Sequence, residues 1–108
     1  MYNGANGLKG ETMVVHIVMF KFKEENKAVH MAQAKEMLES LADTVPSLRS
    51  MEVGVNIADE ARAMDMSIIT TFDDMEGLRA YAVDETHQRV IAFIKDVCEY
   101  TKVVDYEK

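Results

Sequence analysis

The chain has 108 residues, of which 48% are hydrophobic and 29% are charged, the composition of a single globular domain. Its formal net charge is -7 at pH 7, so it lacks the excess of Lys and Arg with which proteins bind nucleic acid or anionic membrane surfaces. No apolar run reaches the roughly 20 residues that span a bilayer. Neither nucleic acid nor a membrane is therefore an expected partner.

The single cysteine, Cys98, limits the chemistry of the chain. One thiol cannot form an internal disulfide or a multi-cysteine metal site, and a lone thiol fits a cytoplasmic protein. Ile91, Ile94 and Val97 are its neighbours at helical spacing, which indicates a small buried apolar residue rather than a reactive nucleophile. We therefore predict a cytoplasmic location and a buried Cys98.

The first 12 residues differ from the rest of the chain. Gly4, Gly7 and Gly10 recur among polar residues, and neither apolar alternation nor the apolar core of a signal peptide is present. We expect residues 1–12 to be a flexible tail or a remnant of cloning. Residues 13–108 are expected to form one domain.

The segment 14–23 is predicted to be a strand because it is rich in β-branched and aromatic residues. His16, Val18 and Phe20 fall on one face, and Ile17 and Met19 fall on the other. Both faces are apolar over the first half of the strand. A strand of this kind needs a covering layer on each side.

A helix is predicted over 27–44, with an apolar stripe at helical spacing that ends before Pro46. Residues 48–57 and 65–72 alternate with a period of two and are predicted strands. Gly54 within the first of them indicates a bulge or a close backbone approach. The apolar stripe of the helix consists of Met31, Ala34, Leu38, Leu41 and Val45.

Asp73 and Asp74 are candidate caps for a helix that starts near Met75. Residues 83–86 interrupt the apolar pattern. A second helical stretch is predicted over 87–99, with Val90 and Ile94 facing inward, and a last alternating strand over 100–106.

The order strand, helix, strand, strand, helix, strand predicts an α+β, ferredoxin-like βαββαβ fold with a four-stranded antiparallel sheet. Two helices can cover only one face of that sheet. Because strand 14–23 is apolar on both faces, the second face needs a partner, and a second copy of the chain is the simplest one. We predict a homodimer formed through the sheet face.

Three stretches together resemble the stress-responsive α/β-barrel domain family, known as Dabb. The first is His-Ile-Val-Met-Phe-Lys-Phe-Lys at 16–23, and the second is Val-Pro-Ser at 45–47 followed by Glu-Val-Gly-Val-Asn at 52–56. The third runs from Phe-Asp-Asp at 72–74 through Leu78, Tyr81 and His87 to Val-Val-Asp-Tyr at 103–106. The resemblance covers nearly the whole chain, from residue 14 to residue 106.

This resemblance implies a dimer whose two sheets pack into a barrel. It also implies a candidate site, because a plant member of the family is a polyketide cyclase that uses two histidines and a tyrosine around a pocket between sheet and helices. The matching positions here are His16, Tyr81 and His87. The family often has His-Pro-x-His before the second histidine, whereas this chain has Asp-Glu-Thr-His at 84–87.

Two interpretations of His16, Tyr81 and His87 stay open at this point. As a site, two histidines divide acid and base roles near neutral pH, and Tyr81 hydrogen-bonds a substrate oxygen. As structure, His16 is a core histidine with one hydrogen bond, Tyr81 places its hydroxyl at the surface, and Thr86 caps a helix that begins with His87. His30 is expected to be solvated.

Metal and cofactor sites are not predicted. A His-His-carboxylate set from His16, His87 and Asp84 or Glu85 lacks any short ligand spacing, and no phosphate-binding glycine loop is present. Two functions are therefore compared: a dimer that binds a small apolar or aromatic ligand without turnover, and a small enzyme. The enzyme would be a polyketide-cyclase-like protein, an isomerase or a cofactor-free oxygenase.

Overall fold

The computed structural model describes residues 12–108, so the prediction for residues 1–12 concerns a segment of which all but Thr12 lies outside the described residues. The elements follow the predicted order. They are β1 (Val14–Phe22), α1 (Lys27–Thr44), β2 (Ser50–Val55), β3 (Met66–Phe72), α2 (Met75–Val83), α3 (Glu85–Val97) and β4 (Cys98–Glu107).

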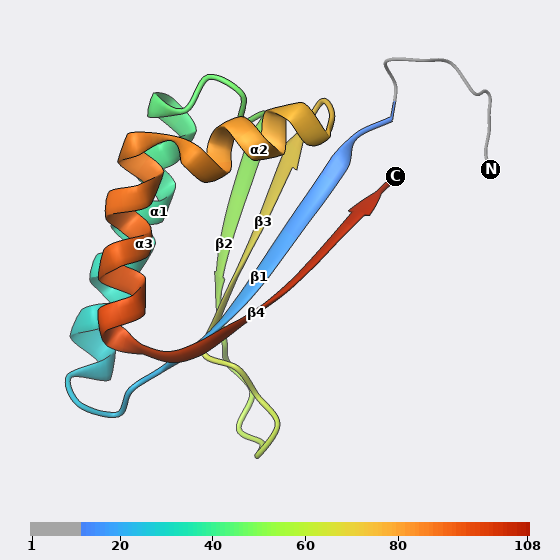
Figure 1. Cartoon of the computed structure of the whole chain (residues 1–108). Helices are drawn as coiled ribbons and strands as arrows, with labels where there is room; N and C mark the ends of the chain where they lie inside the picture. The colour runs from blue at the N-terminus through green and yellow to red at the C-terminus, as the bar shows by residue number, and fades with distance from the viewer. Residues whose placement is uncertain (1–11) are drawn as a thin grey trace.

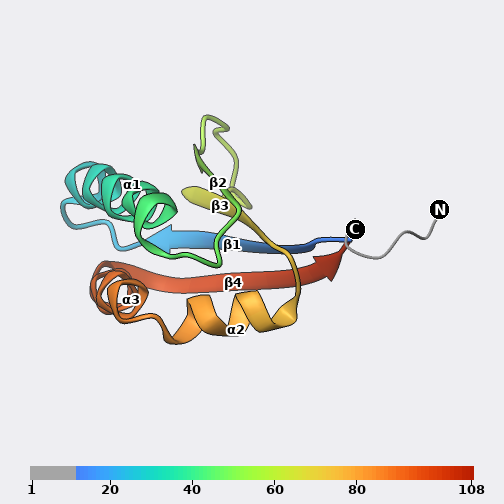
Figure 2. The same ribbon diagram turned by 90° about the horizontal axis from the view of Figure 1, so that it is seen from above.

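The four strands form one antiparallel sheet in the order β2-β3-β1-β4. The helices lie together on one side of this sheet, with α1 beside α3 (Figure 1). Seen from above, α3 and α2 follow one another along β4 (Figure 2). This arrangement confirms the predicted α+β, ferredoxin-like fold.

The second half of the helical layer is divided at Asp84, where the sequence pattern is interrupted. The Asp84 carboxylate accepts hydrogen bonds from the backbone N–H groups of Thr86 (2.8 Å) and His87 (3.2 Å). It is therefore the N-cap of α3. The expectation that Thr86 caps this helix was wrong, because the carboxylate two residues earlier already satisfies the free N–H groups.

The aspartate pair at the start of α2 has two different roles. Asp74 is the N-cap, and its side chain accepts a hydrogen bond from the N–H of Gly77 at 2.9 Å, as predicted for a capping residue. Asp73 instead pairs with Arg49 at 2.8 Å, joining the start of α2 to the segment before β2.

The hydrophobic core lies between the helices and the sheet face that carries alternate residues of β1. Phe22 and Phe72 are fully buried there against Leu38 and Leu41 of α1, which belong to the predicted stripe. Gly54 does not form a bulge, since β2 pairs with β3 in continuous register from Ser50 to Val55. The register of the sheet shifts instead between Lys21 and Phe22, where β1 meets β4.

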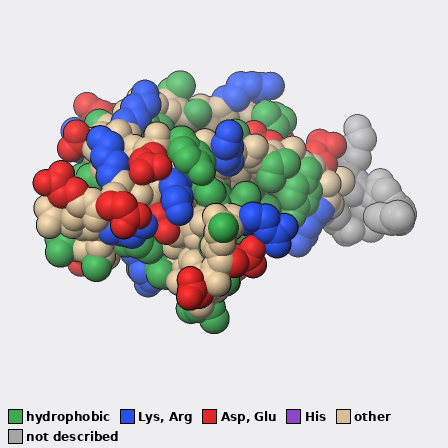
Figure 3. Space-filling model, turned by 90° about the horizontal axis from the view of Figure 1, so that it is seen from below, with side chains coloured by type: hydrophobic (Ala, Val, Ile, Leu, Met, Phe, Trp, Pro, Cys, Tyr) green, Lys and Arg blue, Asp and Glu red, His purple; other side chains and the backbone are tan. Residues whose placement is uncertain are grey.

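The opposite sheet face carries the other residues of β1. Ile17 lies between Ile69 of β3 and Val104 of β4, and residues opposite each other on antiparallel strands share a face. Several side chains of this outer face are more than a third exposed, namely Met19, Ile69, Tyr100, Val104 and Tyr106. Seen from below, hydrophobic side chains also reach the surface between charged ones (Figure 3).

No helix within residues 12–108 is both long enough and apolar enough to cross a membrane.

Candidate functional site

A cavity of about 430 Å³ lies between the α2–α3 segment and strands β1 and β4. All three residues singled out in the sequence, His16, Tyr81 and His87, line it. Three different elements bring them together: β1 carries His16, α2 carries Tyr81, and the first turn of α3 carries His87. The candidate residues thus share one concave surface.

His16 is held by the sheet. The Thr70 hydroxyl of β3 donates a hydrogen bond to the backbone carbonyl of His16 at 3.1 Å. On the other side, β4 places Asp105 opposite His16, and Oδ1 of Asp105 lies 2.5 Å from Nδ1 of His16. A carboxylate that accepts a hydrogen bond from Nδ1 of a neutral histidine keeps the ring proton on Nδ1, so that Nε2 is left without a proton and can accept one. Nε2 is therefore the ring nitrogen of His16 that is left to accept a proton or a hydrogen bond.

Tyr81 is almost completely buried, with 1% of its surface exposed. The expectation that its hydroxyl reaches the surface was wrong, because α2 faces the sheet and packs this ring against Phe72. The buried hydroxyl has no hydrogen-bond partner among the described residues. Burial raises the pKa of Tyr81 well above its ordinary value, so the hydroxyl stays protonated and able to donate.

His87 stacks on Tyr81, with the ring centroids 3.8 Å apart and the planes inclined by 29°. His16 meets the same tyrosine ring edge-on, at a centroid distance of 6.2 Å. Burial lowers the pKa of His87, and this effect exceeds the opposing one of the Ala82 and Tyr81 carbonyls. Near neutral pH, His87 is therefore an uncharged ring beside the tyrosine.

Asp105 is the residue of this site that the sequence did not reveal. It lies within the strand predicted over 100–106 and was given no role there, whereas in the structure its carboxylate contacts Nδ1 of His16. Alternation within 100–106 puts Asp105 on the face of Val103, but only the β1–β4 register identifies His16 as its neighbour.

The third histidine, His30, lies outside the site. It was expected to be solvated, yet it is half-buried on α1 and meets Phe93 of α3 edge-on at 6.2 Å. It does not line the cavity. Among the described residues, no three His, Cys, Asp or Glu side chains gather as a metal site.

Cys98 also lines the cavity and is buried, as predicted. It does not close the last helix, as the sequence pattern indicated, but begins β4. Burial raises the pKa of its thiol to about 11. At neutral pH this cysteine is a protonated, weakly nucleophilic wall residue.

The sheet topology and the helical layer define the chain as an α+β protein of the ferredoxin-like class. Within that class it belongs to the stress responsive A/B barrel domain (Dabb) family, whose family model matches residues 14–108. The family predicted from the three sequence stretches is thereby confirmed. A search of curated protein sequences finds no match.

Solved structures share this fold. A dimeric protein of unknown function from Bacteroides fragilis NCTC 9343 is 30% identical, with a TM-score of 0.80 over 89% of this chain and 96% of that chain. A dimeric ferredoxin-like protein of unknown function from Jannaschia sp. CCS1 is also 30% identical, with a TM-score of 0.75 over 87% and 97%. The hydroxynitrile lyase from Passiflora edulis shares the fold at 17% identity, with a TM-score of 0.80 over 89% and 93%.

Proposed function

We propose that this protein is a small enzyme that moves a proton on an apolar molecule bound between sheet and helices. The observation that carries the proposal is His16, which lines the cavity while Asp105 holds its Nδ1, together with the Tyr81 hydroxyl, which lines the same cavity and has no hydrogen-bond partner within residues 12–108. An oriented histidine base and a protonated donor are the two groups that proton transfer beside a carbonyl requires. Isomerisation or cyclisation through an enolate is the reaction class that fits.

The proposed step assigns one role to each residue. Nε2 of His16 takes a proton from the carbon next to a carbonyl, and the C–H electron pair moves so that negative charge develops on the carbonyl oxygen. Tyr81 donates a hydrogen bond to that oxygen, while Asp105 stabilises the imidazolium that forms. His16 then returns the proton to a different atom. His87 keeps the tyrosine ring in place.

Hydrogen–deuterium exchange tests this proposal without knowledge of the natural substrate. We expect the protein to speed the exchange of α-protons in apolar ketones dissolved in D₂O, as measured by NMR. His16→Gln should lose a hundredfold or more of that rate, on the order of what general base catalysis contributes. Asp105→Asn and Tyr81→Phe should be intermediate.

His30→Gln is the matched control, because His30 lies outside the cavity, and it should exchange at the wild-type rate. Wild-type protein without exchange activity on any ketone of the panel would contradict the proposal, and so would His16→Gln as fast as wild type. Ligand binding that survives without exchange would leave the second function, a binding protein without turnover. The Passiflora edulis lyase shows that an enzyme can be built on this fold, which is support by analogy alone.

We also infer that two copies associate through the outer sheet face. Met19, Ile69 and Val104 expose apolar side chains on that face, which its own helices do not cover. The Bacteroides fragilis and Jannaschia proteins, which share the fold at 30% identity, are dimeric. The cytoplasmic location stays a prediction from the cysteine content.

The proposed dimer can be tested by introducing a charged residue at the centre of the outer sheet face. Ile69→Lys should halve the mass measured by sedimentation equilibrium while the far-ultraviolet circular dichroism stays unchanged. The matched control is Val83→Lys, because Val83 is 75% exposed on α2, away from this face. A wild-type chain that sediments as a monomer would refute the inference.

A further inference from the structure

The length of the cavity can be judged from two of the elements that line it, β1 and α3. On β1 the lining residues His16, Val18 and Phe20 span about 13 Å at roughly 3.3 Å per residue. On α3 the lining runs from His87 to Ile94, about 10 Å at roughly 1.5 Å per residue. The space therefore extends well beyond the reach of the proposed catalytic residues.

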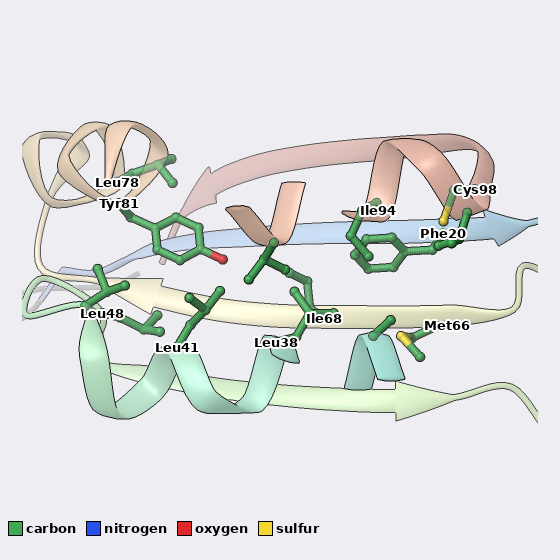
Figure 4. Close-up of a cluster of buried hydrophobic side chains, with 14 of the residues drawn as sticks. Phe20, Leu38, Leu41, Leu48, Met66, Ile68, Leu78, Tyr81, Ile94 and Cys98 are labelled. Atoms are coloured by element: carbon green, nitrogen blue, oxygen red, sulfur yellow. The ribbon is translucent and has the colours of Figure 1, made fainter. Parts of the chain in front are cut away.

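The two ends of the cavity differ in chemistry. His16, Tyr81 and His87 form one end, and Cys98 lies at the other, with Ile68, Ile94 and Phe20 between Tyr81 and Cys98 (Figure 4). The tyrosine hydroxyl points towards that apolar stretch and away from Leu78. Most of the remaining lining is also apolar, formed by Val18, Leu38, Val90, Ile91 and Val103, while Tyr100 and Thr101 of β4 line the cavity near Cys98.

Charge is confined to the outside of the lining. Lys95 and Glu99 are exposed and have opposite signs, so together they do not favour either charge in a ligand. Among residues 12–108, no Lys or Arg lines the polar end, where His87 is uncharged near neutral pH. A carboxylate placed there would be desolvated beside the neutral His87, and His16 already pairs with the Asp105 carboxylate, so a further negative charge is unfavourable.

We propose that the ligand is an uncharged, slender molecule with one carbonyl or hydroxyl oxygen at Tyr81 and an unbranched apolar tail that extends to Cys98. Cys98 is then the residue that limits ligand length. This inference rests on the proposed function only in using the same cavity, and it concerns binding rather than turnover.

A series of straight-chain alcohols tests both parts of this inference by isothermal titration calorimetry. From butanol to decanol, affinity should rise about fourfold for each added methylene, because each one buries about one CH₂ of apolar surface. The rise should stop once the tail reaches Cys98. The matched carboxylates, such as octanoate, should bind at least tenfold more weakly than the alcohol of equal length at neutral pH.

Cys98 itself provides a second readout, because it is the only thiol in the chain. At saturating concentrations, long alcohols should slow its reaction with methyl methanethiosulfonate at least tenfold. Butanol, which fills only the polar end, should leave the reaction rate within about twofold of the free protein. This measurement uses the wild-type chain and does not depend on the folding of a variant.

Cys98→Leu should move the length of best fit to a shorter alcohol, whereas Val83→Leu on the exposed side of α2 should not. Affinity independent of chain length, carboxylates that bind as tightly as alcohols, or equal protection of Cys98 by short and long alcohols would overturn the inference. Failure of the proposed reaction is a separate result, since His16→Gln would then show no loss of exchange while the length dependence persisted.

Discussion

The two faces of strand β1 differ in what covers them, although both are apolar. On the inner face, Phe20 and Phe22 are buried by the helices of the same chain. On the outer face, Met19 is 40% exposed, and its neighbours Ile69 and Val104 are also exposed. An apolar pattern in a strand thus predicts that a face will be covered, but it does not say whether the cover comes from the same chain.

The largest predicted effect on stability comes from comparing Ile68 and Ile69, neighbouring residues of β3 that lie on opposite faces of the sheet. Ile68 is 3% exposed on the inner face and Ile69 is 37% exposed on the outer face. Ile68→Ala should lower the free energy of unfolding by about 2–5 kcal/mol, because it opens a cavity in the core. Ile69→Ala should cost less than about 1 kcal/mol in the monomer.

Urea unfolding at several protein concentrations separates the two effects. The loss in Ile68→Ala should not depend on concentration, whereas that in Ile69→Ala should shrink on dilution as the dimer dissociates. Equal, concentration-independent losses in both variants would mean that the two faces are covered in the same way.

A smaller effect is expected at Asp84, the residue between α2 and α3 that caps the N-terminus of α3. Asp84→Ala should lower the free energy of unfolding by about 1 kcal/mol, because the N–H groups of Thr86 and His87 lose their acceptor. Thermal unfolding measures the loss. Asp84→Asn is the control and should recover most of it, since an amide oxygen also accepts these bonds; an Asn variant as unstable as the Ala variant would contradict the capping role.

The smallest predicted effect is a pH dependence at His87. Because burial lowers its pKa in the folded chain, the unfolded chain binds a proton more readily. The stabilisation from the neutral ring is complete above the unfolded pKa of about 6.5 and is lost as the pH falls below it.

The variant His87→Phe retains an aromatic ring against Tyr81 but cannot titrate. We expect the difference in unfolding free energy between wild type and His87→Phe to change in favour of the variant as the pH drops below about 6.5. Urea titrations at a series of pH values measure this difference, which cancels the acidic groups common to both chains. A difference that stays constant with pH would contradict a lowered pKa.

Much of the fold follows from local pattern. The helix predicted over 27–44 has the same limits in the structure, and the interruption predicted over 83–86 contains the boundary between α2 and α3. The predicted ends of the strands were less accurate. Cys98 was predicted to lie in the helix 87–99 but begins β4, because an apolar residue at a junction fits both a helical and a strand periodicity.

The candidate site was predictable only in part. His16, Tyr81 and His87 were named from a family resemblance, and the structure brings them to one cavity. Two features were not predicted: the contact of Asp105 with His16, and the lack of a hydrogen-bond partner for the Tyr81 hydroxyl in the described part of the chain. Each depends on what lies opposite across a strand pair or a helix–sheet contact.

The sequence by itself determined the order of elements, the α+β class and the apolar character of both faces of β1, because these depend on residue type and spacing along one chain. The tertiary structure decided which face the helices cover, which carboxylate meets His16 and how far the cavity extends. Those properties depend on the register between strands distant in sequence, where a shift of one residue would turn Asp105 to the opposite face.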